Sequence, residues 1–381
     1  MPYWHDTCML IFRGGNMKIK NLIVSALSLV LLLSLVSPLS LSAQEKSQEK
    51  QEQSTAIIIP ETVKTAIQEG IQTRQPRLDI PFTIIKHFYL PAQQNIQVIL
   101  FFKVKNSDLG FASITSNIEG QKKKQEKEDE AQSIFETTPN KLNAKANVFL
   151  QFNKLEDNIP GEVVKEVYIP FNLEVDGVSY EPDKEEIYSF GYPIPPGDYL
   201  LSTAITSNNL DKIGTQYYEL SLPNLVSFSG ELDTSPIFYV KNIEQMSAPE
   251  AQVQIHKGFF TYSILQIVPN LENLFSPKDN LDLFFFILGA KPNEQGKFDI
   301  EINYEVCKGE AIQIRYQPQI YDSPLISQPL PMKKTVLIKS EEGEKKETRD
   351  LEPGSYTLSL KITDKISGNS ITRTIDFEIK T

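Results

Sequence analysis

The stretch PGDYLLSTAIT at residues 196–206 returns as PGSYTLSLKIT at residues 353–363, which begins 157 residues later. The shared pattern is P-G-x-Y-x-L-S-x-x-I-T, and the alignment runs without a gap into the next apolar stretch. There, alternate residues correspond again: Tyr218, Leu220 and Leu222 to Ile375, Phe377 and Ile379. A turn followed by two stretches of period two is typical of paired β-strands. The repeat therefore predicts two copies of one β module.

The start of each copy predicts a specific corner. Proline presets its own backbone angle, and glycine tolerates a positive φ, so the pair makes a tight entry to a strand. In Greek-key sandwiches a tyrosine near the start of a late strand often donates its hydroxyl hydrogen bond to the backbone of the preceding corner. We predict such a structural corner in both copies, formed by Pro196, Gly197 and Tyr199, and by Pro353, Gly354 and Tyr356.

Alternating apolar residues predict strands along most of the chain. In the first module we expect strands at 82–90, 96–105, 146–152, 163–173, 198–207, 216–222 and 235–242. In the second we expect strands at 259–268, 281–288, 298–306, 312–317, 334–339, 355–363 and 372–379. Alternation along 298–306 places Phe298, Ile300, Ile302, Tyr304 and Val306 on the inward face. The stretch 281–288 is apolar on both faces, which is typical of a central strand or of one beneath an inter-domain contact.

Composition sets the expected domain limits. A polar, proline-containing stretch at 246–251 separates a first β-sandwich domain at 57–245 from a second at 252–381. The first is expected to open with a short helix over 60–70, where proline stands at the first helical position and glycine at the end. It also holds a mixed-charge run at 116–141 that reads as a solvated loop.

The second copy of the repeat carries a family resemblance. Residues 351–364, LEPGSYTLSLKITD, resemble the L-x-P-G-x-Y-x-L-x-V-x-V-x-D strand of fibronectin type III and other immunoglobulin-like bacterial domains. They are also similar to sandwich modules of secreted acidobacterial proteins, including those with a GWxTD motif, which this chain lacks. The resemblance implies an all-β fold of two tandem immunoglobulin-like Greek-key sandwiches in an extracytoplasmic setting, and it implies no catalytic residue.

The N-terminal part reads as a targeting segment. Lys18 and Lys20 precede an apolar run that ends at Pro38 and small residues, so residues 17–43 have the layout of a signal peptide. We expect cleavage after Ala43, with cleavage after Ser42 or an uncleaved anchor as alternatives. Residues 1–16 are then a mis-assigned start, and the polar residues 44–56 a disordered tether. We expect a periplasmic or secreted protein with no stable membrane anchor after cleavage.

The charge of the chain narrows the expected partners. The net charge is −11 at pH 7 over the whole sequence, with 49 acidic residues against 38 basic ones. An acidic protein repels phosphate backbones and anionic lipid surfaces. We therefore do not expect the protein to bind nucleic acid. We expect a protein partner, with a glycan as the alternative.

Residues capable of chemistry are sparse. His87 and His256 each stand alone in a strand-like segment, and Cys307 follows a strand on its outer face without a histidine nearby. Neighbouring carboxylates such as Glu185 with Glu186 are expected to be solvated surface groups. We therefore expect no catalytic residue, no metal and no cofactor.

These observations favour a non-enzymatic interaction or structural module of the bacterial cell envelope. Its edge strands and loops are where a partner would bind. Two alternatives stay open at this point: a carbohydrate-binding module, which exposed coplanar tyrosines would favour, and an extracytoplasmic enzyme or inhibitor with a loop-borne site.

Overall fold

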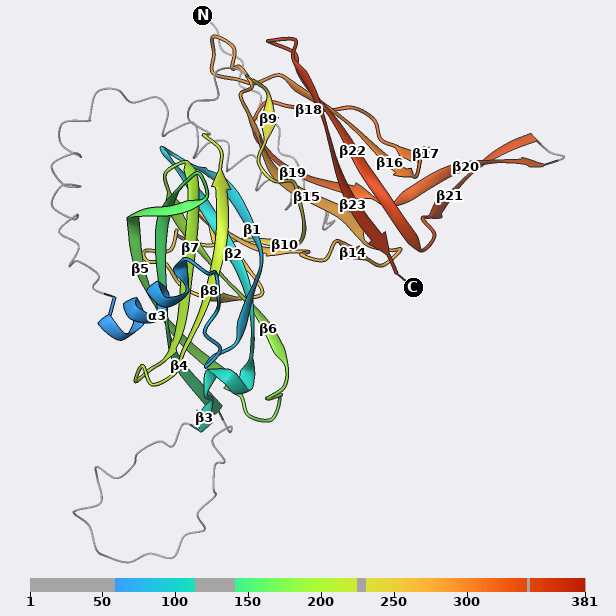
Figure 1. Ribbon diagram of the computed structural model, residues 1–381. Helices are drawn as coiled ribbons and strands as arrows, with labels where there is room; N and C mark the ends of the chain where they lie inside the picture. Colours follow the sequence, from blue (N-terminus) through green and yellow to red (C-terminus); the bar gives the residue numbers. More distant parts are fainter. Residues whose placement is uncertain (1–58, 114–140, 225–230, 341–342, 381) are drawn as a thin grey trace, which may run out of the picture. The chain divides into compact units, whose positions relative to one another are not determined.

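Strands account for 62% of the residues that the computed structural model describes, and one α-helix accompanies them there. The structure describes residues 59–113, 141–224, 231–340 and 343–380 (Figure 1). The predicted start at 1–16, the signal peptide at 17–43 and the tether at 44–56 lie outside these residues. All but the last residue of the predicted charged loop at 116–141 also lies outside them.

Two sheets build the first module. One has the order β1-β2-β6-β11, with bounds β1 (Phe82–Ala92), β2 (Asn95–Lys105), β6 (Glu185–Ile194) and β11 (His256–Lys257). In the other, β4 pairs with β5 along one edge and with β7 along the opposite edge, and β8 pairs with β7. Its bounds are β3 (Ala112–Ser113), β4 (Lys141–Glu156), β5 (Ile159–Asp176), β7 (Gly197–Ser207) and β8 (Ile213–Leu222).

The second module also has two sheets. The first has the order β12-β13-β10-β15-β19, with β9 beside β15: β9 (Asp233–Thr234), β10 (Phe238–Gln245), β12 (Phe260–Tyr262), β13 (Leu265–Pro269), β15 (Asn280–Leu288) and β19 (Leu325–Pro331). The second has the order β14-β23-β22-β16-β17, with β18 beside β16: β14 (Leu274–Phe275), β16 (Ile300–Lys308), β17 (Ala311–Arg315), β18 (Gln319–Tyr321), β22 (Gly354–Asp364) and β23 (Ser370–Ile379).

The same strand order occurs in both modules. The order β1-β2-β6 is matched by β10-β15-β19, and the order β5-β4-β7-β8 by β17-β16-β22-β23. In immunoglobulin-type sandwiches the first, second and fifth strands share one sheet, and the third, sixth and seventh share the other. Both modules follow this rule, and the repeated segment supplies the sixth strand of each, β7 and β22. The all-β sandwich expected from the sequence is confirmed.

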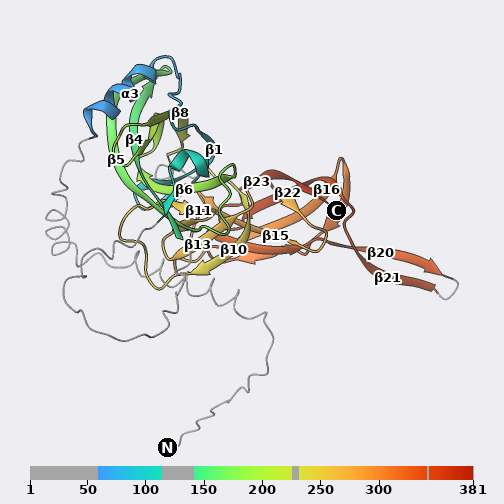
Figure 2. The same cartoon turned by 90° about the horizontal axis from the view of Figure 1, so that it is seen from below.

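The second module carries one insertion that the first lacks. Between β19 and β22 the chain forms a separate two-stranded hairpin of β20 (Lys333–Ser340) and β21 (Gly343–Asp350). The hairpin extends away from the neighbouring sheet in both views (Figures 1 and 2).

The pairing of β10 and β11 corrects the predicted boundary between the groups of strands. We expected 235–242 to close the first module, but β10 pairs with β13 and β15 and so belongs to the second. Conversely, β11 was placed in the second domain, and its His256 and Lys257 pair with Ser189 and Tyr188 of β6 in the first. Strand pairing is decided by distant partners, and the polar stretch at 246–251 marked only a loop.

Each module encloses its own apolar core. In the second module Ile300, Ile302, Tyr304 and Val306 of β16 are fully buried, as their alternation predicted. In the first module, inward residues of β4 and β7 such as Phe152 and Leu201 are buried in the core.

A helix covers part of the outer face of the β4-β7-β8 sheet. The helix α3 (Glu61–Ile71) matches the predicted helix at 60–70 to within one residue at each end. Its buried face, including Val63 and Ile67, packs on Phe149, Ala204 and Ile213. The Tyr217 hydroxyl donates to the Ile67 carbonyl at 2.8 Å, which ties the helix to β8.

An aromatic layer joins strands of the two modules. Phe88 of β1 stacks on Phe238 of β10 at 4.3 Å between ring centroids, and Phe101 of β2 meets Phe260 edge-on at 6.0 Å. Phe284 of β15 lies 5.5 Å from Phe238. The stretch 281–288 therefore lies beneath an inter-module contact, as its two apolar faces predicted.

Candidate functional site

The predicted corner residues lie where the sequence placed them, one set in each module. The Tyr199 hydroxyl donates to the Pro195 carbonyl at 3.0 Å, and the Tyr356 hydroxyl donates to the Glu352 carbonyl at 2.7 Å. Burial raises the pKa of both tyrosines, so both hydroxyls keep the proton that they donate. Gly197 and Gly354 have φ of 146° and 145°, which favours glycine at both turns that Pro196 and Pro353 open. These residues fix the turn into β7 and β22 and offer no reactive group.

The strand β5 carries the candidate binding site. It is 18 residues long, and among the described strands it pairs with β4 alone, so its other side is a free sheet edge. We call this side the β5 edge. A free edge presents unpaired backbone N–H and C=O groups, which can pair with a strand of another chain. Figure 1 shows β5 at the outer margin of the first module.

The position of Pro170 indicates which residues of β5 direct their backbone N–H and C=O groups toward the free edge. A proline within a sheet lies where its missing N–H would have pointed to solvent. The backbone N–H and C=O groups of successive residues point to opposite sides of a strand. The residues that share the outward direction of Pro170 are therefore Glu166, Tyr168, Asn172 and Glu174. The pairing with β4 runs without a register shift from 165 to 176, so the alternation holds over this stretch.

The side chains of β5 divide between two environments. Val167, Ile169 and Phe171 point into the core and are at most 4% exposed. Tyr168, on the opposite face, is 41% exposed. Beyond the core, near the turn to β4, Ile159 is 64% exposed and Val163 is 44% exposed. The free edge is therefore apolar on its inner side and at its end near the turn.

Carboxylates flank the middle of the β5 edge. Glu166 pairs with Lys64 of α3 at 3.6 Å, and Glu174 pairs with Lys141 of β4 at 3.4 Å. The side chains of Glu174 and Lys141 are both more than half exposed. An exposed pair of this kind contributes little to stability, so a partner's cation can replace Lys141. The Glu166–Lys64 pair is less exposed, with 23% and 36% of the two side chains accessible.

The residues of β5 were expected to form a strand at 163–173 and were not expected to form a binding site. The signal was present, because a proline within a strand pattern indicates an edge strand. Pro170 supplies that signal.

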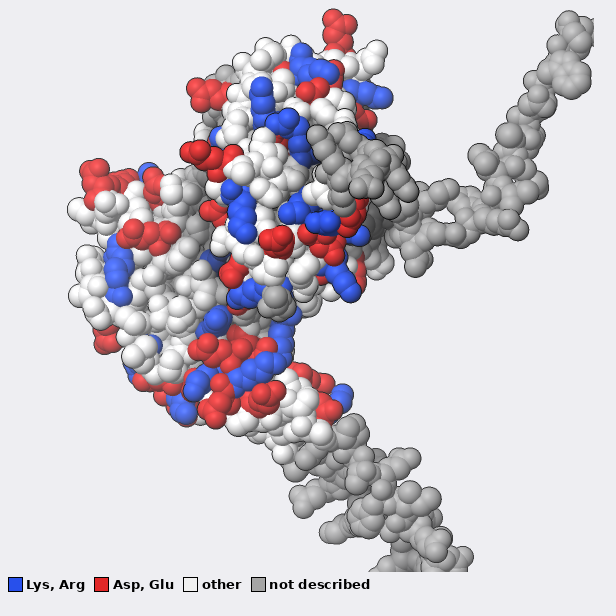
Figure 3. Space-filling model, turned by 90° about the vertical axis from the view of Figure 1, so that its right-hand side faces the viewer, with Lys and Arg blue, Asp and Glu red and all other residues white. Residues whose placement is uncertain are grey.

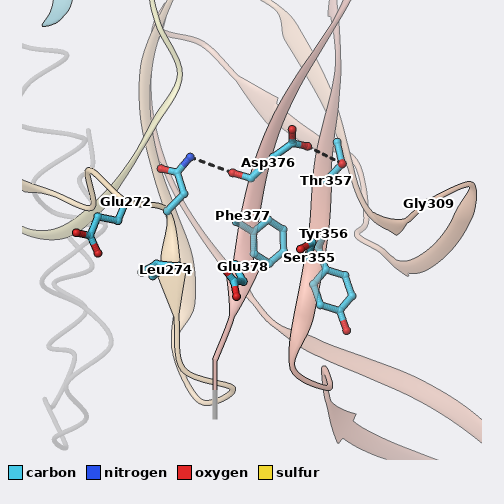
Figure 4. Close-up of a pocket in the computed structure, with 10 residues that line it drawn as sticks. Glu272, Leu274, Gly309, Ser355, Tyr356, Thr357, Asp376, Phe377 and Glu378 are labelled. Atoms are coloured by element: carbon cyan, nitrogen blue, oxygen red, sulfur yellow. Dashed lines mark hydrogen bonds between the residues drawn. The ribbon is translucent and has the colours of Figure 1, made fainter. Parts of the chain in front are cut away.

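A shallow hollow of about 590 Å³ lies on the second module, lined by residues of β14, β22 and β23 (Figure 4). Asn273 donates to the Asp376 carbonyl at 2.9 Å, and Thr357 donates to the Asp376 carboxylate at 2.6 Å. The remaining lining includes Glu272 and Glu378. Asn273 and Thr357 are thus both bonded to Asp376, and the carboxylates of Asp376, Glu272 and Glu378 make this side of the hollow acidic.

His87, His256 and Cys307 are not brought together. His87 Nδ1 lies 3.0 Å from the Tyr218 hydroxyl, and burial lowers its pKa. His256 Nε2 lies 3.1 Å from a Glu250 carboxylate oxygen that also accepts from Thr261 at 2.9 Å. Cys307 is a free thiol on β16.

Carboxylates are engaged in local contacts. Glu186 accepts from Lys184 at 3.0 Å and from Lys257 at 3.1 Å. Within the described ranges no three His, Cys, Asp or Glu side chains are grouped so that they could hold a metal ion.

Three further findings concern the described residues. Of the tyrosines that the structure describes, Tyr168 alone belongs to the exposed class, so the described surface holds no pair of exposed coplanar tyrosines. On the face drawn in Figure 3, Lys and Arg are interspersed with Asp and Glu and form no basic stripe. In the part of the chain that the structure covers, no helix is both long and apolar enough to cross a membrane.

Comparison with known proteins adds little to this picture. No family model matches the chain, and no curated protein matches it. Among solved structures, the crystal structure of Salmonella alpha-2-macroglobulin mutant Y1175G is 10% identical, with a TM-score of 0.15. The match covers 81% of this chain and 17% of that one. A TM-score this low carries no argument about fold or function.

Proposed function

We propose that this protein is a non-enzymatic, secreted or periplasmic interaction module of the bacterial cell envelope, and that the β5 edge is its binding site. The observation that carries the proposal is a strand of 18 residues with one free edge in the described structure. Near the end of the strand, Ile159 and Val163 expose apolar side chains, which a bound partner would shield from water.

Binding would proceed by strand addition. An extended segment of the partner lies beside β5 and pairs with the outward backbone groups of Glu166, Tyr168, Asn172 and Glu174. Each such hydrogen bond is worth about 1 kcal/mol net, so several are needed for a stable complex. The Tyr199 corner bond fixes the turn into β7, which belongs to the same sheet as β5.

The test is capture of envelope proteins by the intact chain with one backbone donor removed. Asn172→Pro deletes an outward N–H in the way that Pro170 already does, and Asn172→Ala keeps this N–H while shortening the side chain. We expect the partner retained by wild type and Asn172→Ala to be lost with Asn172→Pro, while circular dichroism shows all three folded. Equal retention by all three would refute the site. Retention of glycan alone, by all three, would support the carbohydrate-binding alternative instead.

A further inference from the structure

We infer that the ligand of the β5 edge is an extended protein segment with apolar residues on one face and Lys or Arg at two positions eight residues apart on the other. This inference rests on the proposed function and names the chemistry of the partner. It follows from the two faces of β5 and from the place of Pro170.

The inner face sets the apolar half of the pattern. Val167, Ile169 and Phe171 are buried, and they are the last core residues before the sheet ends. Directly opposite residues on neighbouring strands direct their side chains to the same face. Partner residues opposite these three would therefore extend the core, and apolar side chains are the ones that gain from this burial.

The outer face sets the basic half. Glu166 and Glu174 lie on this face, eight residues apart, which spans roughly 26 Å of extended chain. Their present partners, Lys64 and Lys141, lie at 3.6 and 3.4 Å, and the Glu174–Lys141 pair is the more exposed of the two. A cationic residue directly across from each carboxylate meets it at cross-strand distance, where opposite charges stabilise and like charges destabilise the pairing.

The centre of the edge argues against a second copy of the same strand. An antiparallel pair of two β5 edges centred on Pro170 would place Glu166 of one chain opposite Glu174 of the other, twice. It would also bring together two prolines that lack a donor. A different chain that carries Lys or Arg opposite Glu166 and Glu174 would replace this repulsion between carboxylates by attraction.

Two nine-residue peptides test the charge pattern. KVSVSVSVK places valines on one face and lysines eight residues apart on the other, and EVSVSVSVE differs only at the two charged ends. Fluorescence anisotropy with the full-length chain should show the lysine peptide binding at least about tenfold more tightly, because each end changes from an attractive to a repulsive pair. Equal affinities, or binding of neither peptide, would overturn the inference.

Variants of the protein separate this inference from the proposed site. The double change Glu166→Lys and Glu174→Lys should reverse the preference for the two peptides. Asn172→Pro should weaken binding of the lysine peptide, and Asn172→Ala should leave its affinity unchanged. If Asn172→Pro abolishes binding while the charge reversal changes nothing, the site stands and the partner chemistry is wrong. If Asn172→Pro leaves both peptide binding and envelope capture unchanged, the site itself is wrong.

Discussion

The hydroxyl of Tyr356 donates a 2.7 Å hydrogen bond to the carbonyl of Glu352, four residues earlier in the chain. This bond closes the turn through Pro353 and Gly354 before the chain enters β22. The ring of Tyr356 stacks on Phe377 of the neighbouring strand, with centroids 5.5 Å apart. The side chain thus joins the corner to the core of the second module.

Removing this hydroxyl should destabilise the protein. We expect Tyr356→Phe to lower the free energy of unfolding by about 1 kcal/mol, since the ring and its stacking stay and one hydrogen bond is lost. Urea unfolding measures the change. Tyr168→Phe is the matched control, because its hydroxyl bond to Asn147 is exposed, and it should have a smaller effect. A wild-type stability for Tyr356→Phe would contradict the structural role of the corner.

The glycine at the corner should not tolerate a side chain. Gly197 has a φ of 146°, and a methyl group there would lie 3.3 Å from the Tyr199 hydroxyl. We expect Gly197→Ala to cost about 1–3 kcal/mol, the range for a strained backbone. Gly161→Ala is the control, since Gly161 has no positive φ and its nearest contact to such a methyl is 3.4 Å away. Thermal melting of both variants compares them, and equal melting temperatures would refute the strain.

Stability should fall in mild acid because of His87. Burial lowers the pKa of His87 below its usual 6.5. In the pH range between the lowered value and 6.5, the unfolded chain binds a proton that the folded chain does not. The contribution of His87 is therefore complete above about pH 6.5 and decreases as the pH falls toward the folded-state pKa.

The pH effect of His87 is isolated by comparison with a neutral variant. Unfolding free energies of wild type and His87→Asn, measured at several pH values from 7.5 to 5, should converge as the pH falls. Parallel curves would show that His87 titrates alike in both states. The difference between the two proteins cancels the contributions of all titratable groups that they share.

The aromatic layer should carry much of the stability of the chain. Phe88 is 5% exposed and contacts Phe238 and Phe101. We expect Phe88→Ala to lower the unfolding free energy by about 3–5 kcal/mol, the range for truncation of a buried phenylalanine. Val178→Ala, at a side chain 89% exposed, should change it by less than about 0.5 kcal/mol. A small loss for Phe88→Ala would mean that the layer packs loosely.

Local patterns in the sequence determined much of this protein. The repeated P-G-x-Y segment, the period-two alternation and the helix over 60–70 each depend on residues close together in the chain. For that reason the two modules, the inward residues of β16 and the place of the corner tyrosines could be predicted. The polar stretch at 246–251 was misleading as a boundary, because it leads from β10 of the second module back to β11 of the first, so the chain passes between the modules more than once.

The tertiary structure alone decided which strands lie next to one another. The same alternating pattern suits an edge or a central strand, so β10 and β11 could be assigned only once their partners were known. The free edge of β5 follows from the same cause: its sequence predicts a strand, and only the pairing with β4 on one side leaves the other side open. Backbone pairing joins residues distant in sequence, so the candidate site was decided by the fold.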